Sequence, residues 1–362
     1  MDCSQNNAVG SRVAQSCCRN TAWTVAWTAL VAATAGLELS TLPAARATPP
    51  GERVEAVTVR RGDLVVDFRD NAQSPALLSG IQSLRNLRHA ANFDAYDPDG
   101  RGSSAGLNFE HIISGRSDEA NRFSPRHGPY ACYHVPDSDT VTLVRLADDS
   151  PWKMASTMRY TVVAPHYVDF EFRCIPQDAA RFGPRGYGIF FWANYMNQVS
   201  DVALNFRGVA RPGESESWIA ATAPPGHPDY IGGGTYRHVD APALEYDENH
   251  NFKLNVWSYD QPRYARPFYY GRADHDMALT LMFDRGYTDV DEIRFSLFKF
   301  KVNDEQRKPA WDFQYVIHQV AAGREYGFRG RLAWTRFVSP TECRREYDAW
   351  AACLNAPQET SQ

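Results

Sequence analysis

The stretch GYGIFFWANY, residues 186–195, decides the fold class, because side chains of two kinds alternate along it. Alternation with a period of two is typical of a β-strand that turns one face toward a core. We assign Ile189 and Phe191 to the buried face, and Trp192 and Asn194 to the opposite, outer face.

The same period recurs on both sides of this stretch, and short turns separate its occurrences. Few of the intervals could hold a crossover helix, which excludes a parallel α/β sheet and predicts an all-β, antiparallel β-sandwich of the jelly-roll kind. Two long Pro- and Gly-rich loops, 209–243 and 260–276, interrupt it. The expected strands are 107–112, 140–146, 157–163, 167–174, 186–194, 201–207, 252–258, 277–283, 292–302, 311–319 and 331–337.

Two helices are expected outside this sandwich. Ser74 caps the first, Pro75 takes its first position, and Leu77, Leu78, Ile81, Leu84 and Leu87 recur on one face. The second lies in the C-terminal tail, 341–362. We therefore divide the chain into a signal peptide (1–47), an N-terminal part with two strands, helix and loop (48–106), the β-sandwich (107–340) and this tail.

The first 47 residues have the layout of a secretory signal peptide. Arg12 and Arg19 precede an apolar run from Thr21 to Leu37, and Ala45-Arg46-Ala47 matches a small-x-small cleavage site. We expect a secreted or periplasmic protein without a membrane segment after cleavage. An uncleaved anchor is the alternative, although the run is short for a membrane span.

Four cysteines follow this segment: Cys132, Cys174, Cys343 and Cys353. In an oxidising compartment they predict at least one disulfide, and three pairings are open. Cys343 and Cys353 pair only if the helix expected between them bends, because ten residues of straight helix span about 15 Å.

The charge balance bears on the partners. Lys and Arg number 38 against 43 Asp and Glu, a formal net charge of −5. Nucleic-acid binders usually carry a basic excess, so a nucleic-acid partner is not expected. We expect a monomer.

Several expected strands place aromatic, amide and arginine side chains on one face. These are Trp192, Asn194, Asn205, Arg207 and Trp257. An aromatic ring offers an apolar surface to the C–H face of a sugar, while amide and guanidinium groups bind hydroxyls and anions. The face therefore predicts a glycan site, and Trp192→Ala is expected to weaken binding and leave the fold intact. The alternative is that these residues decorate a solvated sheet face or pack under the long loops.

The segments YVDFEFR (167–173) and GYGIFFW (186–192) resemble the concanavalin A-like lectin and glucanase superfamily. The resemblance implies two curved antiparallel sheets and a concave face that holds carbohydrate. Members include lectins, glycoside hydrolases and polysaccharide lyases. The Glu-x-Asp-x-x-Glu strand of their retaining hydrolases is absent here, so that catalytic pair does not carry over.

Two regions carry candidate acid–base groups. If the loop 123–130 returns beside strand 107–112, then Glu110, Arg126 and His127 converge, the glutamate as acid or base and the arginine as anion ligand. The loop 224–238 contributes His227, Tyr230 and His238. A lyase needs a His or Tyr base, a Tyr acid and a cation or amide for the uronate. A surface salt bridge and a mobile polar lid are the respective alternatives.

Further candidates concern the cleft wall and metal binding. Tyr269, Tyr270 and Arg272 form a second aromatic–basic group that suits the opposite wall of a cleft. Asp94, Asp97 and Asp99 resemble part of a calcium loop but lack its glutamate, so an Asx-rich turn is preferred to calcium. Neither a phosphate loop nor a dinucleotide fingerprint is present, so no cofactor is expected.

These observations together predict a secreted carbohydrate-active enzyme, a polysaccharide hydrolase or lyase. The alternative is a lectin-like protein that binds glycans without cleaving them. The sequence does not distinguish these activities or name the sugar.

The mature protein is expected to begin near Thr48, because the cleavage pattern ends at Ala47. Amino-terminal sequencing of the mature protein tests this, and an intact Met1 would contradict it.

Overall fold

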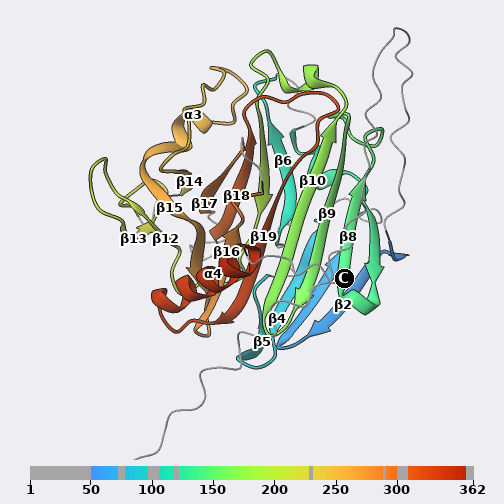
Figure 1. Cartoon of the computed structure of the whole chain (residues 1–362), viewed down its shortest axis with the longest axis vertical. Helices are drawn as coiled ribbons and strands as arrows, with labels where there is room; N and C mark the ends of the chain where they lie inside the picture. Colours follow the sequence, from blue (N-terminus) through green and yellow to red (C-terminus); the bar gives the residue numbers. More distant parts are fainter. Residues whose placement is uncertain are drawn as a thin grey trace, which may run out of the picture.

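The computed structural model describes residues 50–71, 78–96, 106–116, 122–227, 231–287, 291–299 and 309–355. Within them the chain is mostly β-structure, arranged in one large and one small sheet (Figure 1). The strands of the large sheet are β1 (Glu52–Val54), β6 (Asn108–Ile113), β7 (Ala131–Val135), β8 (Thr140–Arg145), β9 (Met154–Val163), β10 (Tyr167–Pro176), β11 (Gly188–Ala193), β12 (Leu204–Val209), β13 (Ser217–Ala221), β14 (Gly232–His238), β15 (Ser258–Arg272), β16 (Met277–Phe283), β17 (Glu292–Lys299), β18 (Pro309–Ile317) and β19 (Tyr326–Arg336).

Thirteen of these strands lie in the order β1-β7-β8-β9-β10-β19-β16-β15-β14-β17-β18-β11-β6, and β12 and β13 attach at β15. Among the described pairs only β14 and β15 run parallel. The small sheet contains β2 (Ala56–Arg61), β3 (Leu64–Arg69), β4 (Gly80–Asn86) and β5 (Ala90–Asp94) in that order. The helices are α2 (Ser124–His127), α3 (Leu254–Trp257) and α4 (Pro340–Asn355), and the short 3-10 turns are η1 (Pro136–Ser138) and η2 (Ala179–Phe182).

The two ends of the large sheet face each other across an aromatic core. Trp192 of β11 stacks on Phe109 of β6 and Phe313 of β18, with ring centroids 4.7 and 5.4 Å away. Phe172 of β10 meets the same indole edge-on at 4.7 Å. The β8–β9–β10 end therefore packs directly on the β18–β11–β6 end.

The predicted outer position of Trp192 is therefore wrong. Its side chain is fully buried, and so are Ile189 and Phe191 on the other face of the strand. β11 and β18 are buried on both faces, because residues 244–254 pack on the face that turns away from the core. Alternation shows that two faces differ, but it does not show which one meets water.

The helix predicted around residues 74–87 is a strand where it is described. Residues 72–77 lie outside the described part, and β4 covers the rest of the apolar pattern. A bulge makes Ile81 pair with Phe68 and Ser83 with Asp67, so that Gln82 is the extra residue. It brings Ile81 and Leu84 to one face and reproduces the i, i+3 spacing of a helix.

The two predicted long loops and one predicted strand also differ from the structure. The loops contain β13, β14 and β15, and the Gly residues of β14 and the Pro and Arg residues of β15 concealed their strand patterns. The predicted strand 252–258 is instead the single turn α3 leading into β15.

The expected disulfide is absent. None of the four cysteines forms a disulfide with another. Cys132 on β7 and Cys174 on β10 are separated by two strands, β8 and β9. Cys343 and Cys353 both lie on α4, which forms where a helix was expected. Burial raises the pKa of Cys343 to about 11 and that of Cys132 to about 12, so both stay thiols at neutral pH.

Trp192→Ala is expected to lower the free energy of unfolding by about 3–5 kcal/mol, because it leaves a cavity among Phe109, Phe172 and Phe313. Urea unfolding measures this loss. Trp218→Ala, at a partly exposed site on β13, is the matched control and should cost much less. Equal losses for the two variants would contradict the core position of Trp192.

Candidate functional site

Glu110 lies at the centre of a group of polar side chains on the face of the large sheet that turns away from the aromatic core. Phe191 pairs with His111 and Trp192 with Phe109, which leaves Glu110 as the extra residue of a β-bulge. The bulge lets Phe109 enter the core while Glu110 reaches Tyr195, which follows β11 on the opposite face. Bulges often re-aim a side chain next to active sites.

Three side chains bind the Glu110 carboxylate. Arg126 Nη1 of α2 donates to Oε1 at 2.8 Å, and the Tyr195 hydroxyl donates to the same oxygen. His111 Nδ1 lies 3.0 Å from Oε2. The segment 123–130 brings Arg126 to Glu110, as the sequence analysis considered, but it does not bring His127 to them.

The surroundings of Glu110 fix its protonation state. Burial alone would raise its pKa, but the hydrogen bonds from His111 and Tyr195 and the positive charge of Arg126 outweigh burial, and the pKa is lowered. Burial lowers the pKa of His111, with Arg122 and Arg126 adding to this effect. At neutral pH the site therefore contains an ionised glutamate and a neutral histidine.

This protonation state fixes the tautomer of His111. An ionised carboxylate only accepts hydrogen bonds, so His111 Nδ1 must donate to Glu110, and Nε2 then carries a lone pair. That Nε2 is buried and has no hydrogen-bond partner among the described residues. Arg126 Nε is also buried and has no hydrogen-bond partner among the described residues. The pair resembles a base held in one orientation by a carboxylate, an arrangement that favours proton transfer.

A second carboxyl group lies near the first. Asp312 of β18 is buried, and its Oδ1 accepts from the Asn194 amide at 2.8 Å. Burial and the charge of Glu110 raise the pKa of Asp312 well above its ordinary value. The pKa values of two neighbouring carboxyl groups are thus shifted in opposite directions, which is a common property of acid–base sites.

Aromatic rings enclose His111. It stacks on Phe191 at 4.4 Å, and Phe123 and Phe252 approach at 5.2 and 5.4 Å. Phe123 precedes α2, and Phe252 precedes α3. The imidazole is therefore shielded from solvent by two segments remote in sequence.

The other predicted catalytic residues do not join this group. His127 is exposed at the end of α2, and His227 is exposed beyond β13. Tyr230 lies outside the described residues. His238 is buried on β14, where its Nδ1 accepts from the Asp240 backbone amide and its Nε2 contacts Arg285. Burial and the nearby charge of Arg285 lower the pKa of His238 to about 4. His238 is thus a neutral structural histidine.

Three predicted glycan ligands are interior residues. Trp192 belongs to the core stack, and Asn194 Oδ1 accepts from the Tyr96 hydroxyl and the Leu107 amide. Tyr269 donates from within the core to the carbonyls of Trp311 and Asp312. The expectation that they face a ligand is contradicted by their burial.

The remaining predicted ligands lie in other parts of the fold. Asn205 and Arg207 lie on β12, where Arg207 pairs with Glu216 at 2.9 Å. Tyr270 is buried, Arg272 lies 4.6 Å above Phe337, and Trp257 contacts Phe298 at 5.3 Å. They do not form one cleft wall with Glu110.

The candidate calcium loop falls mostly outside the described residues, since Asp97 and Asp99 are not part of them. Asp94 binds the Ser83 hydroxyl and the amides of Leu84 and Tyr96, as in an Asx turn. In the described ranges no group of three or more His, Cys, Asp or Glu side chains could hold a metal.

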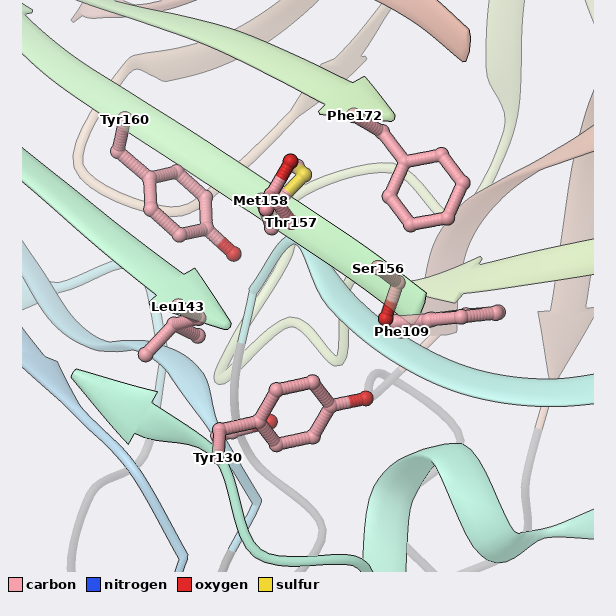
Figure 2. Close-up of a pocket in the computed structure, with 9 residues that line it drawn as sticks. Phe109, Tyr130, Leu143, Ser156, Thr157, Met158, Tyr160 and Phe172 are labelled. Atoms are coloured by element: carbon pink, nitrogen blue, oxygen red, sulfur yellow. The ribbon is translucent and has the colours of Figure 1, made fainter. Parts of the chain in front are cut away.

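Figure 2 shows a cavity of about 10 Å³ between β6, β8, β9 and β10. It is bordered mainly by Phe109, Leu143, Met158 and Phe172, and the hydroxyls of Tyr130 and Tyr160 already donate to backbone carbonyls. This volume corresponds to one water molecule and not to a sugar.

Sequence reasoning missed His111, Tyr195 and Asp312. Tyr195 shares the parity of Ile189 and Phe191, so it was assigned to the core face. Only the bulge at Glu110, which has no sequence signal of its own, brings it to the carboxylate. The adjacent Glu110-His111 pair was the one available clue.

Neither a family model nor a curated sequence matches the chain. Among solved structures, a mutant heparan sulfate lyase from Pedobacter heparinus is 8% identical with a TM-score of 0.37, over 76% of this chain and 34% of that chain. An aldose epimerase homologue from C. elegans is 11% identical with a TM-score of 0.40, over 80% of this chain and 100% of that chain. A galactosidase domain of an alpha-galactosidase-sucrose kinase is 9% identical with a TM-score of 0.40, over 78% of this chain and 41% of that chain.

The chain thus spans about a third of the lyase. Such similarity is too low to identify a family or an activity. In the part of the chain that the structure describes, no helix has the length and hydropathy to cross a bilayer.

Glu110→Gln is expected to lower the free energy of unfolding by about 1–3 kcal/mol at pH 7, because charge-assisted hydrogen bonds are lost. A depressed pKa stabilises the fold above the ordinary value of 4.5, and this contribution disappears as pH falls through the folded-state pKa. The difference between wild type and variant should therefore shrink on acidification. Urea unfolding from pH 7 to pH 3 measures it, and a constant difference would contradict an ionised Glu110.

Proposed function

We propose that the protein is a carbohydrate-active enzyme and that its reaction is the β-elimination of a uronate-containing polysaccharide. The observation that carries this proposal is the arrangement of His111, Tyr195 and Arg126 on one Glu110 carboxylate. These are the three group types that elimination requires: a base, a proton donor and a cation.

Each group has a definite role in the proposed reaction. His111 Nε2, oriented by Glu110, removes the proton next to the uronate carboxylate. Arg126 uses its Nε face to stabilise the charge that develops on that carboxylate. The Tyr195 hydroxyl protonates the departing sugar oxygen, and burial favours its protonated form by raising its pKa. The product carries an unsaturated sugar.

Hydrolysis is the second candidate, and the two carboxyl groups favour it. The pKa of Asp312 is raised and that of Glu110 is lowered, as those of the acid and the base of a glycosidase are. Mass analysis of digested polysaccharides distinguishes the two reactions, since elimination gives unsaturated products and hydrolysis saturated ones. Binding without any product would overturn both and favour a lectin.

The wider setting belongs to the same proposal. We place the enzyme outside the cytoplasm, as a monomer that needs no cofactor. The jelly-roll and concanavalin A-like description of the fold rests on the motifs in 167–192 and is proposed with it.

His111→Gln and Tyr195→Phe are each expected to lower turnover of alginate, pectate or a glycosaminoglycan by about 10²–10⁴-fold, because each removes a proton-transfer group. Ultraviolet absorbance of the unsaturated product measures the rate.

The chain offers a matched control on another face of the large sheet. Glu171 binds the hydroxyl of Tyr287 together with Arg159 and Arg173, in a more exposed copy of the same chemistry. Tyr287→Phe should leave turnover unchanged. Equal effects of Tyr287→Phe and Tyr195→Phe would place the activity elsewhere.

A further inference from the structure

Three side chains form a row across neighbouring strands on the face of the large sheet that turns away from the aromatic core. Phe191 of β11 pairs with His111 of β6 on one side and with Gln314 of β18 on the other. All three are at most 2% exposed. The imidazole lies nearly parallel to the Phe191 ring, at an interplanar angle of 15°.

The two polar ends of this row have unused hydrogen-bonding capacity. His111 Nε2 and Gln314 Oε1 have no partner among the described residues. The Gln314 amide nitrogen donates only a long bond of 3.3 Å to Thr235. Buried polar groups are normally paired, so two unused acceptors beside one aromatic ring call for an explanation. A sugar ring matches them, since its C–H face packs on an aromatic ring and its hydroxyls donate to acceptors.

Residues 244–257, named the strap here, lie over this row. Phe252 contacts His111, and Leu254 packs on Val316 and Ile189. Trp257 meets Phe298, whose ring lies 5.5 Å from Phe191. Apolar side chains of the strap therefore occupy the space that a ligand on the row would need.

The polar contacts of the strap lie mainly in its first half. Arg185 pairs with Glu245 and Asp247, and the backbone amide of Asp247 donates to the Tyr187 hydroxyl at 3.3 Å. The Tyr246 hydroxyl accepts from Arg294 at 2.5 Å and donates to Ser258 at 2.9 Å. No strand pairing involves residues 239–253. His250, Phe252 and Lys253 adopt positive φ angles of 62°, 50° and 60°. L-residues disfavour this region, so the closed strap carries backbone strain that opening would release.

We propose that His111, Phe191 and Gln314 form a sugar subsite, and that the strap must lift before a glycan reaches it and Glu110. The identity of the ligand rests on the proposed function. The opening of the strap does not, because it follows from the cover over His111 and is measurable without substrate.

Histidine modification tests the strap. Diethyl pyrocarbonate acylates accessible neutral imidazoles, and peptide mass analysis gives the rate at each histidine. In the wild type, His111 should react far more slowly than the exposed His127, His227 and His250. Phe252→Ala and Tyr246→Phe should each raise the rate at His111 by roughly tenfold, since both favour local opening.

The control lies on the same strap. Val256 is 62% exposed, so Val256→Ala should leave the rate at His111 unchanged. Circular dichroism and thermal unfolding confirm that each variant is folded. Two results would overturn the proposal that the strap covers His111 and must lift. One is a modification rate at His111 equal to that at His127 in the wild type, and the other is an unchanged rate at His111 in both strap variants.

Binding tests the row. Alginate and xylan oligosaccharides serve as anionic and neutral probes in calorimetry. With a probe that binds the wild type, Gln314→Leu should weaken binding about tenfold, because one hydroxyl partner is lost. An unchanged affinity in Gln314→Leu would remove Gln314 from the subsite. If neither probe binds, the proposed function and the sugar assignment both fail, whereas the modification rates still decide the strap.

Discussion

The stack of Phe109, Trp192 and Phe313 is the contact on which the rest of the structure depends. It joins three strands at one end of the large sheet, and Phe172 of β10 and Phe328 of β19 meet the same indole edge-on at 4.7 Å each. Aromatic pairs prefer such offset and edge-to-face geometries. The stack also fixes the candidate site, because Phe109 in the core forces the bulge that aims its neighbour Glu110 at the opposite face.

Fold class and much of the strand succession followed from the sequence, because alternation is strong where one face of a strand is open. β9 and β10 show it clearly. β11 and β18 are buried on both faces, and their exposed side could not be chosen from periodicity. The two β-bulges could not be predicted from periodicity either, because each shifts the alternation by one residue. The bulge at Gln82 led to the false helix, and the bulge at Glu110 led to the omission of Tyr195 from the site.

Only those residues of the candidate site that lie close together in the sequence could be predicted. Glu110 and Arg126 lie 16 residues apart and are joined by a short returning segment, so local reasoning brought them together. Tyr195 and Asp312 reach the site through long-range pairing, and 85 residues separate Tyr195 from Glu110. His227 and His238 were predicted to be catalytic because the segment around them is rich in Gly, His and Tyr. In the structure His227 is exposed, and the two ring nitrogens of His238 contact Asp240 and Arg285.

Burial distinguishes the two Glu–Tyr–Arg groups of this fold. The Glu171 group lies among arginines whose side chains are 49% and 58% exposed, where water screens the charges and ion pairs contribute little. The Glu110 side chain is only 6% exposed, and Arg126 is its arginine partner among the described residues. Placing an ionised carboxylate in such surroundings has a large desolvation cost, which three hydrogen-bond donors offset. A purely structural role would be met by an apolar side chain at lower cost. An ionised glutamate beside a neutral histidine, whose Nε2 has no hydrogen-bond partner among the described residues, is therefore the arrangement on which the proposed function rests.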